Sequence, residues 1–142
     1  MLYSSLYDDY TFPGGGLKED ESHLDALKRE LKEEVGANKV FNVKPLGYTK
    51  EIRYGITCSN STYLQKSYYY TCDISNVEDP SFVGREKLQG LKSVYINPEN
   101  IIKHNNFINE KRESKQNKGF QTVLIRENKV LKHLLANNLI NT

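Results

Sequence analysis

Three glutamates recur along one short stretch of the chain at the spacing of successive helical turns. Glu30, Glu33 and Glu34 stand at positions i, i+3 and i+4, which in a helix places their carboxylates on one face. Like charges at that spacing repel one another, and the repulsion grows with burial. A bound cation would relieve it, and a ligand set made only of oxygens suits Mg²⁺ or Mn²⁺. The spacing therefore predicts a divalent metal site.

Two further charged residues belong to the same pattern. Arg29 stands four positions before Glu33, where it can hold that carboxylate in place. Glu21 precedes the expected helix and can brace the loop before it or bind an outer metal ion. The alternative for such a stretch is a solvated helix face with ion pairs, which is common in proteins. The adjoining glycine-rich segment favours the functional interpretation.

A loop, a helix and a second loop are expected to present these side chains. Residues 12–16, Phe-Pro-Gly-Gly-Gly, are incompatible with regular structure, because proline lacks a donor and glycine allows positive φ and close backbone approach. Ser22 is the expected N-cap, with Asp25 completing a pair similar to a capping box. Gly36 is a natural C-terminal stop. The helix is therefore predicted between Ser22 and Gly36.

Residues 15–37 fit the pattern G-x5-E-x7-R-E-U-x-E-E-x-G-U, in which U is aliphatic. The defined positions are filled by Gly15, Glu21, Arg29, Glu30, Leu31, Glu33, Glu34, Gly36 and Ala37. At average residue frequencies such a match arises by chance with odds on the order of 10⁻⁹ per starting position. The segment resembles the Nudix box, the signature of hydrolases that cleave a nucleoside diphosphate linked to another group. Ala37 departs slightly, because a larger aliphatic residue is usual there.

The resemblance implies a metal-dependent mechanism. In Nudix enzymes the carboxylates that match Glu30, Glu33 and Glu34 bind divalent metal ions, here Mg²⁺ or Mn²⁺, together with the carbonyl oxygen of the loop glycine, here Gly15. The metal neutralises the diphosphate and lowers the pKa of an attacking water. Hydrolysis is then an in-line displacement at phosphorus, which depends mainly on positioning and electrostatic stabilisation.

The general base varies among Nudix enzymes. It is the glutamate of the Arg-Glu pair, here Glu30, or a carboxylate on a later loop. The chain has four acidic residues in the region of such a loop: Glu78, Asp79, Glu86 and Glu99. We expect Glu86, because it lies just before the apolar-rich residues 91–96, where family members often carry an acidic residue. The alternative for Glu86 is an ordinary surface glutamate.

The box leaves the substrate open, since specificity depends on loops outside it. Gly14, Gly15 and Gly16 are expected to lie against the substrate. Enzymes of the ADP-ribose group commonly carry a proline a little over a dozen residues after the box, and residues 50–54 contain none. A tyrosine at a similar offset marks some dinucleoside polyphosphate hydrolases, and Tyr54 fits that position. Arg53 is expected to pair with a phosphate, with a surface salt bridge as the alternative.

Composition limits the remaining possibilities. A chain of 142 residues is expected to form one domain, residues 1–142. A net charge of only +2 argues against a dedicated nucleic-acid surface, and the resemblance implies a small-molecule nucleotide substrate. Cys58 and Cys72 lack metal-site spacing and no signal peptide is evident, which suggests the cytoplasm. No apolar run approaches membrane-spanning length. The basic cluster in residues 111–118 is expected to be a solvated loop.

The remaining segments predict an α/β fold. Residues 39–52 and 61–74 are rich in Val, Tyr and Thr and should form a hairpin, followed by a shorter strand at 93–96. Pro98 should open a brief helix that ends near Asn105, and leucines at helical spacing predict a longer helix over 121–139. The resemblance refines this expectation to a Nudix-type α/β/α sandwich with a mixed sheet.

Few residues precede the glycine-rich loop. Nudix domains usually place a strand or two there, and residues 1–6 can supply one, so the first N-terminal strand of the fold is expected to be absent. A missing strand leaves a bare sheet edge, which invites pairing with another chain. We therefore expect a homodimer or low stability.

Two functions are compatible with these observations. The first is a metal-dependent pyrophosphohydrolase acting on a nucleoside diphosphate derivative. The second is a catalytically weak Nudix domain that binds a nucleotide or nucleotide sugar as a sensor. The intact set of Arg29, Glu30, Glu33 and Glu34 favours the hydrolase, whereas loss of part of the scaffold would favour the sensor.

Overall fold

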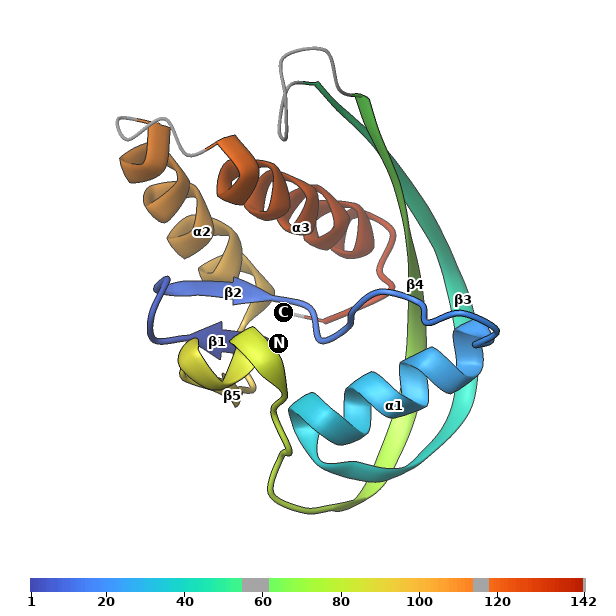
Figure 1. Ribbon diagram of the computed structural model, residues 1–142. Coiled ribbons are helices and arrows are strands. Elements are labelled where there is room, and N and C mark those ends of the chain that lie inside the picture. The colour runs from blue at the N-terminus through green and yellow to red at the C-terminus, as the bar shows by residue number, and fades with distance from the viewer. Residues whose placement is uncertain (55–61, 114–117, 142) are drawn as a thin grey trace.

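The computed structural model describes residues 1–54, 62–113 and 118–141, apart from the side chains of residues 53, 54, 85, 113 and 118–121. Its strands are interleaved with helices along the chain, which confirms the predicted α/β class (Figure 1). The elements are β1 (Leu2–Ser4), β2 (Asp9–Thr11), α1 (His23–Val35), β3 (Ala37–Tyr54), β4 (Thr62–Val77), the 3₁₀ helix η1 (Gly84–Leu88), β5 (Leu91–Ser93), α2 (Pro98–Glu113) and α3 (Lys118–Ala136).

The strands form two sheets in the described part of the chain. The first contains three short strands in the order β2-β1-β5, and the second consists of β3 and β4. The recorded pairings are all antiparallel, so the strand arrangement differs from the mixed sheet expected. Two strands, β1 and β2, precede the glycine-rich loop, where one was expected. They form a hairpin whose β1 strand also pairs with β5, far along the chain.

The helix that carries the glutamates begins and ends as predicted. The Ser22 hydroxyl accepts a hydrogen bond from the Asp25 backbone N–H at 3.1 Å, which satisfies one of the free donors of the first turn. Gly36 adopts a left-handed conformation with φ of 77°, and its N–H donates to the Lys32 carbonyl. A side chain at Gly36 would collide with the backbone of Glu78. This glycine therefore ends α1 and lets the segment after β4 pass close to it.

The predicted hairpin is confirmed by the antiparallel pairing of β3 with β4. Both strands are longer than expected, and the register shifts between Phe41 and Lys44 and again between Pro45 and Gly47. Such bulges bend a strand and increase its twist. The connection between the strands, with Cys58, lies outside the described residues. Cys72 is half-buried in β4.

The prediction that the helix after Pro98 ends near Asn105 was wrong, because α2 continues to Glu113. Asn105 is fully buried, and the apolar pattern of Ile101 continues through Ile108 on the face that packs against α3. The Asn105 side chain accepts a hydrogen bond from the Tyr10 N–H of β2 at 3.0 Å and donates one to the Tyr10 carbonyl at 2.9 Å.

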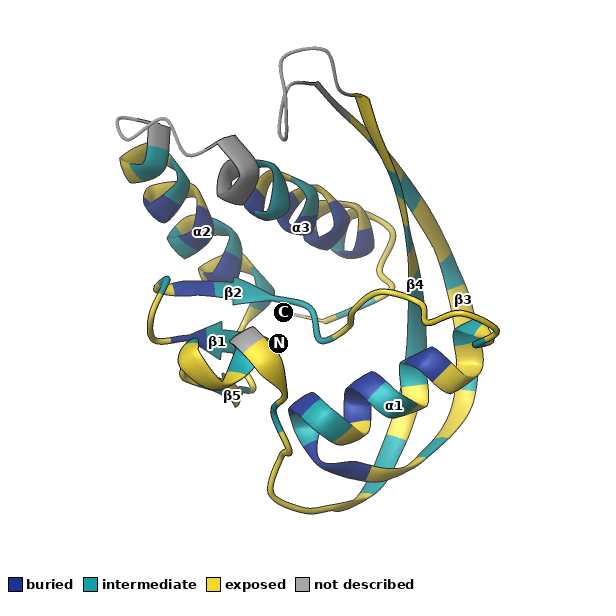
Figure 2. Cartoon of the chain, in the orientation of Figure 1, coloured by how far each residue is buried: buried dark blue, intermediate teal, exposed yellow. Residues whose placement is uncertain are grey.

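The main apolar core lies between α2, α3 and the small sheet (Figure 2). Its α3 residues include Leu124, Leu131 and Leu134, which follow the predicted helical spacing. The helix itself occupies Lys118–Ala136, a few residues earlier than expected. Within the described residues, no helix has the length and apolar character needed to cross a membrane.

The basic cluster expected to form a solvated loop instead continues both flanking helices. Lys111 and Arg112 occupy the last turn of α2, and Lys118 begins α3, while Lys115 lies outside the described residues. Arg112 is largely buried and pairs with Asp9 of β2 at 2.8 Å. A buried ion pair requires both partners, because an unpaired charge in the interior is costly. Arg112 therefore fastens α2 to the strand that leads into the glycine-rich loop.

Candidate active site

Three carboxylates from two elements converge on one side of α1. Glu30 and Glu34 lie one turn apart on the helix, and Glu86 comes from η1. One carboxylate oxygen of each residue lies within 4.8 Å of the others. Glu30 and Glu34 are buried, at 6% and 4% exposure, and Glu86 is half-buried. The cluster is therefore a compact, oxygen-only set of potential metal ligands.

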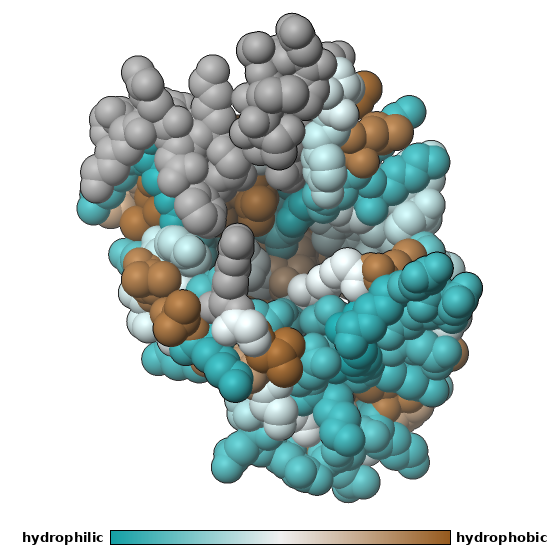
Figure 3. All heavy atoms as spheres, viewed as in Figure 1, coloured by the Kyte–Doolittle hydropathy of each residue, from teal (hydrophilic) through white to brown (hydrophobic). Residues whose placement is uncertain are grey.

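The helix α1 also has a solvent-exposed face. The surface over α1 is mostly hydrophilic in the view of Figure 3. Lys28 and Lys32, which the helical spacing places opposite Glu30 and Glu34, are exposed. The helix thus separates its charges, with lysines outward and Glu30 and Glu34 inward. Buried carboxylates without a cation carry a large desolvation cost.

Glu34 shows the effect of that cost most clearly. Burial raises the pKa of the Glu34 carboxyl to about 8, and the negative charges of Glu30 and Glu86 act in the same direction. The backbone N–H of Gly14 donates to Glu34 Oε2 at 2.7 Å and opposes the rise. Without a cation, the carboxyl is therefore largely protonated at neutral pH.

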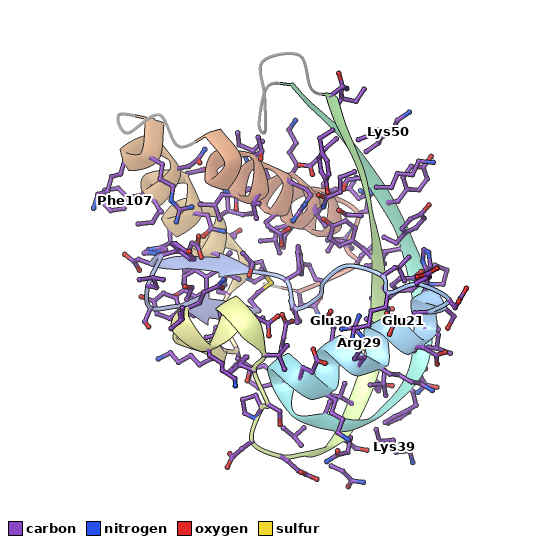
Figure 4. The ribbon with its side chains drawn as sticks, viewed as in Figure 1. Glu21, Arg29, Glu30, Lys39, Lys50 and Phe107 are labelled. Carbon is purple, nitrogen blue, oxygen red and sulfur yellow. The ribbon has the colours of Figure 1, made fainter. Side chains whose placement is uncertain are left out.

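Arg29 organises the entrance to this cluster. Its guanidinium donates to both oxygens of Glu21, at 2.8 and 2.9 Å, and to Glu30 Oε1 at 2.6 Å. It also donates to the Gly16 carbonyl at 3.0 Å. Figure 4 shows Glu21, Arg29 and Glu30 gathered beside α1. Only a planar guanidinium can satisfy two carboxylates and a carbonyl at fixed angles, so Arg29 orients Glu30 and ties down the loop.

Glu21 links Arg29 to the loop before α1. Its side chain accepts a hydrogen bond from the Lys18 backbone N–H at 3.0 Å, in addition to its two bonds with Arg29. The hydrogen bonds from Arg29 lower the pKa of Glu21 to about 2, with the Lys18 N–H and the positive charges of Arg29 and Lys18 acting in the same direction. Glu21 is thus ionised and engaged with Arg29, as in the bracing alternative suggested by the sequence.

Gly15 lies directly against Glu30. A Cβ atom at this position would overlap the Glu30 carboxylate, so a larger residue would displace that carboxylate from its present position. At Gly14 and Gly16 an added Cβ would meet no neighbouring atom within 4 Å, although Gly14 has φ of 153°. Of the three glycines, Gly15 is therefore the one whose small size directly affects the carboxylate cluster.

Glu33 lies apart from the cluster found among the described residues. Its carboxylate stands 3.6 Å from Arg29, as the i, i+4 spacing predicted. Its backbone carbonyl accepts a hydrogen bond from the Ser81 N–H at 2.8 Å, and the Gly36 carbonyl accepts one from the Glu78 N–H at 2.8 Å. The segment that leads to η1 is thereby attached to the C-terminal turn of α1.

The other predicted site residues are distributed differently. Of the late-loop candidates, Glu86 joins Glu30 and Glu34, whereas the Glu78 side chain contacts Asn38 and the Glu99 backbone N–H is bonded to Asn97. The backbones of Arg53 and Tyr54 lie at the end of β3. Their side chains lie outside the described residues, so their predicted substrate contacts stay predictions.

One contact at the entrance of the glycine-rich loop was not predicted from the sequence. The Glu127 carboxylate in α3 accepts a hydrogen bond from the Phe12 backbone N–H at 2.8 Å. Glu127 follows Arg126 in a helix whose leucine spacing indicates only packing, and charged residues are common on such helices. No local signal in the sequence distinguishes Glu127 from a solvated glutamate.

The sequence matches a known family over most of the chain. The family model described as "NUDIX domain" matches residues 4–117. The chain belongs to the Nudix family. Its helices and antiparallel sheets agree with the Nudix-type α/β/α fold, as the resemblance of residues 15–37 implied.

A curated relative shares a shorter stretch. The chain is similar to an RNA pyrophosphohydrolase of a Nitratiruptor species, with 49% identity over 37 residues. The similarity covers 26% of this chain and 24% of the relative. No solved structure matches the chain significantly. The assignment to the Nudix family therefore rests on the family model together with the geometry of α1, the glycine-rich loop and η1.

Proposed function

We propose that this Nudix domain is a divalent-metal-dependent hydrolase that cleaves the pyrophosphate linkage of a nucleoside diphosphate derivative. The observation that carries the proposal is the convergence of Glu30, Glu34 and Glu86 within 4.8 Å. The name of the relative, RNA pyrophosphohydrolase, describes the same class of reaction. Membership of the Nudix family supports the same reaction class.

The residues present fit a divalent cation. Glu30, Glu34 and Glu86 provide only carboxylate oxygens, the donor type that Mg²⁺ and Mn²⁺ prefer. They would hold the ion, joined by Glu33 and the Gly15 carbonyl if the family pattern applies. When bound, such an ion neutralises charge on a diphosphate and makes a water molecule a better nucleophile.

The protein side chains have separate tasks in this proposal. Arg29 keeps Glu30 in one orientation through a 2.6 Å hydrogen bond, so that the carboxylate needs little reorganisation during reaction. The loop of Gly14, Gly15 and Gly16 brings backbone groups close to the carboxylates and to a bound diphosphate. Glu86 is the proposed general base, with Glu30 as the alternative. The half-buried position of Glu86 leaves it accessible to a water molecule.

The substrate class follows from the same reasoning. We propose a small-molecule nucleotide as the primary substrate, bound with its diphosphate beside α1 and with Arg53 and Tyr54 on the nucleoside side. The relative's name, RNA pyrophosphohydrolase, indicates RNA as a second candidate, and a triphosphorylated RNA end contains the same type of anhydride bond. We further propose a cytoplasmic location, consistent with the free thiol of Cys72.

The direct test is a panel of nucleotide derivatives and 5′-triphosphorylated RNA, with Mg²⁺ or Mn²⁺, followed by phosphate and pyrophosphate release. We expect turnover that chelation abolishes. Glu33→Gln and Glu34→Gln should each lower kcat by about 100-fold or more, because each removes a negative ligand or its neighbour. Glu86→Gln should show an intermediate loss if Glu86 is the base.

A matched control is Glu99→Gln, an exposed glutamate in the first turn of α2, which should retain full activity. Turnover that persists in the Glu34→Gln variant would contradict the metal assignment of that residue. Nucleotide binding without hydrolysis of any compound in the panel would instead indicate the sensor function.

A further inference from the structure

A buried ionic network connects α3 to the entrance of the glycine-rich loop. Arg126 donates to Glu127 Oε1 through Nε and Nη2, at 3.0 and 2.9 Å. Its remaining nitrogen, Nη1, reaches Glu51 of β3 at 3.2 Å. The side chain of Glu127 is only 3% exposed. We call Glu51, Arg126, Glu127 and the Phe12 N–H the Glu127 network.

The network ends on the backbone that leads to the carboxylate cluster. Glu127 Oε2 accepts the Phe12 N–H at 2.8 Å, and the Phe12 ring packs edge-on against Tyr69 of β4, with 5.5 Å between ring centroids. Phe12 is thus fixed both by its N–H and by its ring. Two residues later, the Gly14 N–H donates to Glu34 Oε2 at 2.7 Å.

The two oxygens of Glu127 are committed to different partners. Oε1 faces the Arg126 guanidinium and Oε2 faces the Phe12 N–H, so the site requires two acceptors. A carboxylate provides both, whereas a glutamine side chain provides one acceptor and one donor. In a buried position the donor would face either Arg126 or Phe12 without a partner, which is unfavourable.

Arg126 and Glu127 lie outside the residues that the family model matches, because the match ends at residue 117. The box itself ends at Ala37. The contact between α3 and the loop therefore involves side chains that neither the box nor the family model includes. It joins the loop to a helix whose Leu124 and Leu131 are anchored in the core, which makes it a rigid support.

We propose that Glu127 is a positioning residue that fixes the glycine-rich loop so that the Gly14 N–H and the loop backbone face the carboxylate cluster. The proposal rests on the proposed function, because it assigns Glu127 an indirect role in the same site. Glu127 touches neither the carboxylates nor the substrate. It acts through Phe12.

The test compares Glu127→Gln with the wild-type protein by amide hydrogen exchange and by titration with Mn²⁺ alone. We expect faster exchange at Phe12 and Gly14 and Mn²⁺ affinity lowered by about tenfold, the usual scale for losing a group that orients metal ligands. With an active substrate, kcat should fall more than KM rises, since the loop is displaced from the reacting phosphate.

Leu134→Ala is the matched control. It removes a buried α3 side chain, 5% exposed, and lowers thermal stability without touching the loop. At a temperature well below both melting points, it should leave exchange at Gly14 and Mn²⁺ affinity unchanged. Equal effects in both variants would overturn the proposal, because they would show general destabilisation. Unchanged exchange at Gly14 in folded Glu127→Gln would overturn it too.

If Glu127→Gln fails to fold, Glu127→Asp decides the question. Aspartate keeps the negative charge beside Arg126, but its side chain is one methylene shorter and cannot also reach the Phe12 N–H, so faster exchange at Phe12 and Gly14 is expected. Unchanged exchange at both amides in this variant would refute the positioning role. Failure of the proposed function gives a different result, since a wild-type protein without turnover still shows the exchange difference between variants.

Discussion

At the scale of single residues, the site contains carboxyl groups in buried positions, where their ionised form is unfavourable. Glu30 and Glu34 are buried beside Glu86, and Arg29 compensates only Glu30 directly. Glu34 therefore takes up a proton instead, and the raised pKa of its carboxyl follows from burial and from its two acidic neighbours. The same burial would strengthen the attraction of the cluster for a cation once the proton has left.

The Glu34 pKa predicts how stability depends on pH. The carboxyl has a pKa near 4.5 in the unfolded chain and about 8 in the folded protein, so the folded state binds more protons between these values. The free energy of unfolding of the metal-free protein should therefore fall as pH rises from about 4.5 to about 8, as far as Glu34 contributes. Urea denaturation in chelator across this range measures the slope.

Glu34→Gln is the corresponding control, because glutamine keeps the shape of the side chain and does not titrate. As pH rises, the free energy of unfolding should fall less in that variant, and the difference is the contribution of Glu34. A wild-type curve that matches the curve of the variant through the whole interval would show that Glu34 ionises normally in the folded protein.

At the scale of elements, hydrogen bonds and an ion pair join α2 to the strand that leads into the glycine-rich loop. Asn105 accepts from the Tyr10 N–H and donates to the Tyr10 carbonyl, and Arg112 pairs with Asp9. Together these contacts fix the position of β2 relative to α2. The position at which the chain enters the glycine-rich loop is therefore fixed too.

Replacing Asn105 tests this connection. Asn105→Leu leaves the N–H and the carbonyl of Tyr10 without their partners inside the protein, so the free energy of unfolding should fall by about 2 kcal/mol. Thermal and chemical denaturation measure the loss. Asn100→Ala is the control, because Asn100 is exposed in the first turn of the same helix. A melting temperature unchanged by Asn105→Leu would contradict the structural role.

The sequence predicted those elements whose signals are local. The cap of α1, its end at Gly36 and the apolar stripe of α3 depend on neighbouring residues and were predicted correctly. The length of α2 was not predicted, because the buried Asn105 in this helix bonds to Tyr10, a residue far away along the chain. The box gave Glu30 and Glu34 by spacing, and the resemblance suggested Glu86. The contact of Glu127 with Phe12 joins residues 115 positions apart, and no periodicity can reveal it.

At the scale of the whole molecule, the β3–β4 sheet offers a surface for self-association. Its strands span 18 and 16 residues, and each pairs only with the other in the described part of the chain. Long unpaired edges favour pairing with another chain. A homodimer was first expected because a missing N-terminal strand would leave a sheet edge unpaired. It stays a prediction, now based on the edges of the β3–β4 sheet.

Sedimentation velocity over a concentration series tests this prediction. We expect a species of twice the 16.4 kDa chain mass that becomes dominant as concentration rises. A lysine placed at an exposed edge position of β3 should shift the equilibrium toward monomer, whereas the same change at exposed Asn100 should not. A monomer at every concentration, together with a high melting temperature, would refute the expectation of dimerisation or low stability.

The bonds from Glu78 N–H to Gly36 and from Ser81 N–H to Glu33 have a mechanical consequence. They attach the segment that leads to Glu86 to the helix that carries Glu30 and Glu34. Any displacement of the two sheets relative to each other should therefore leave the three carboxylates together.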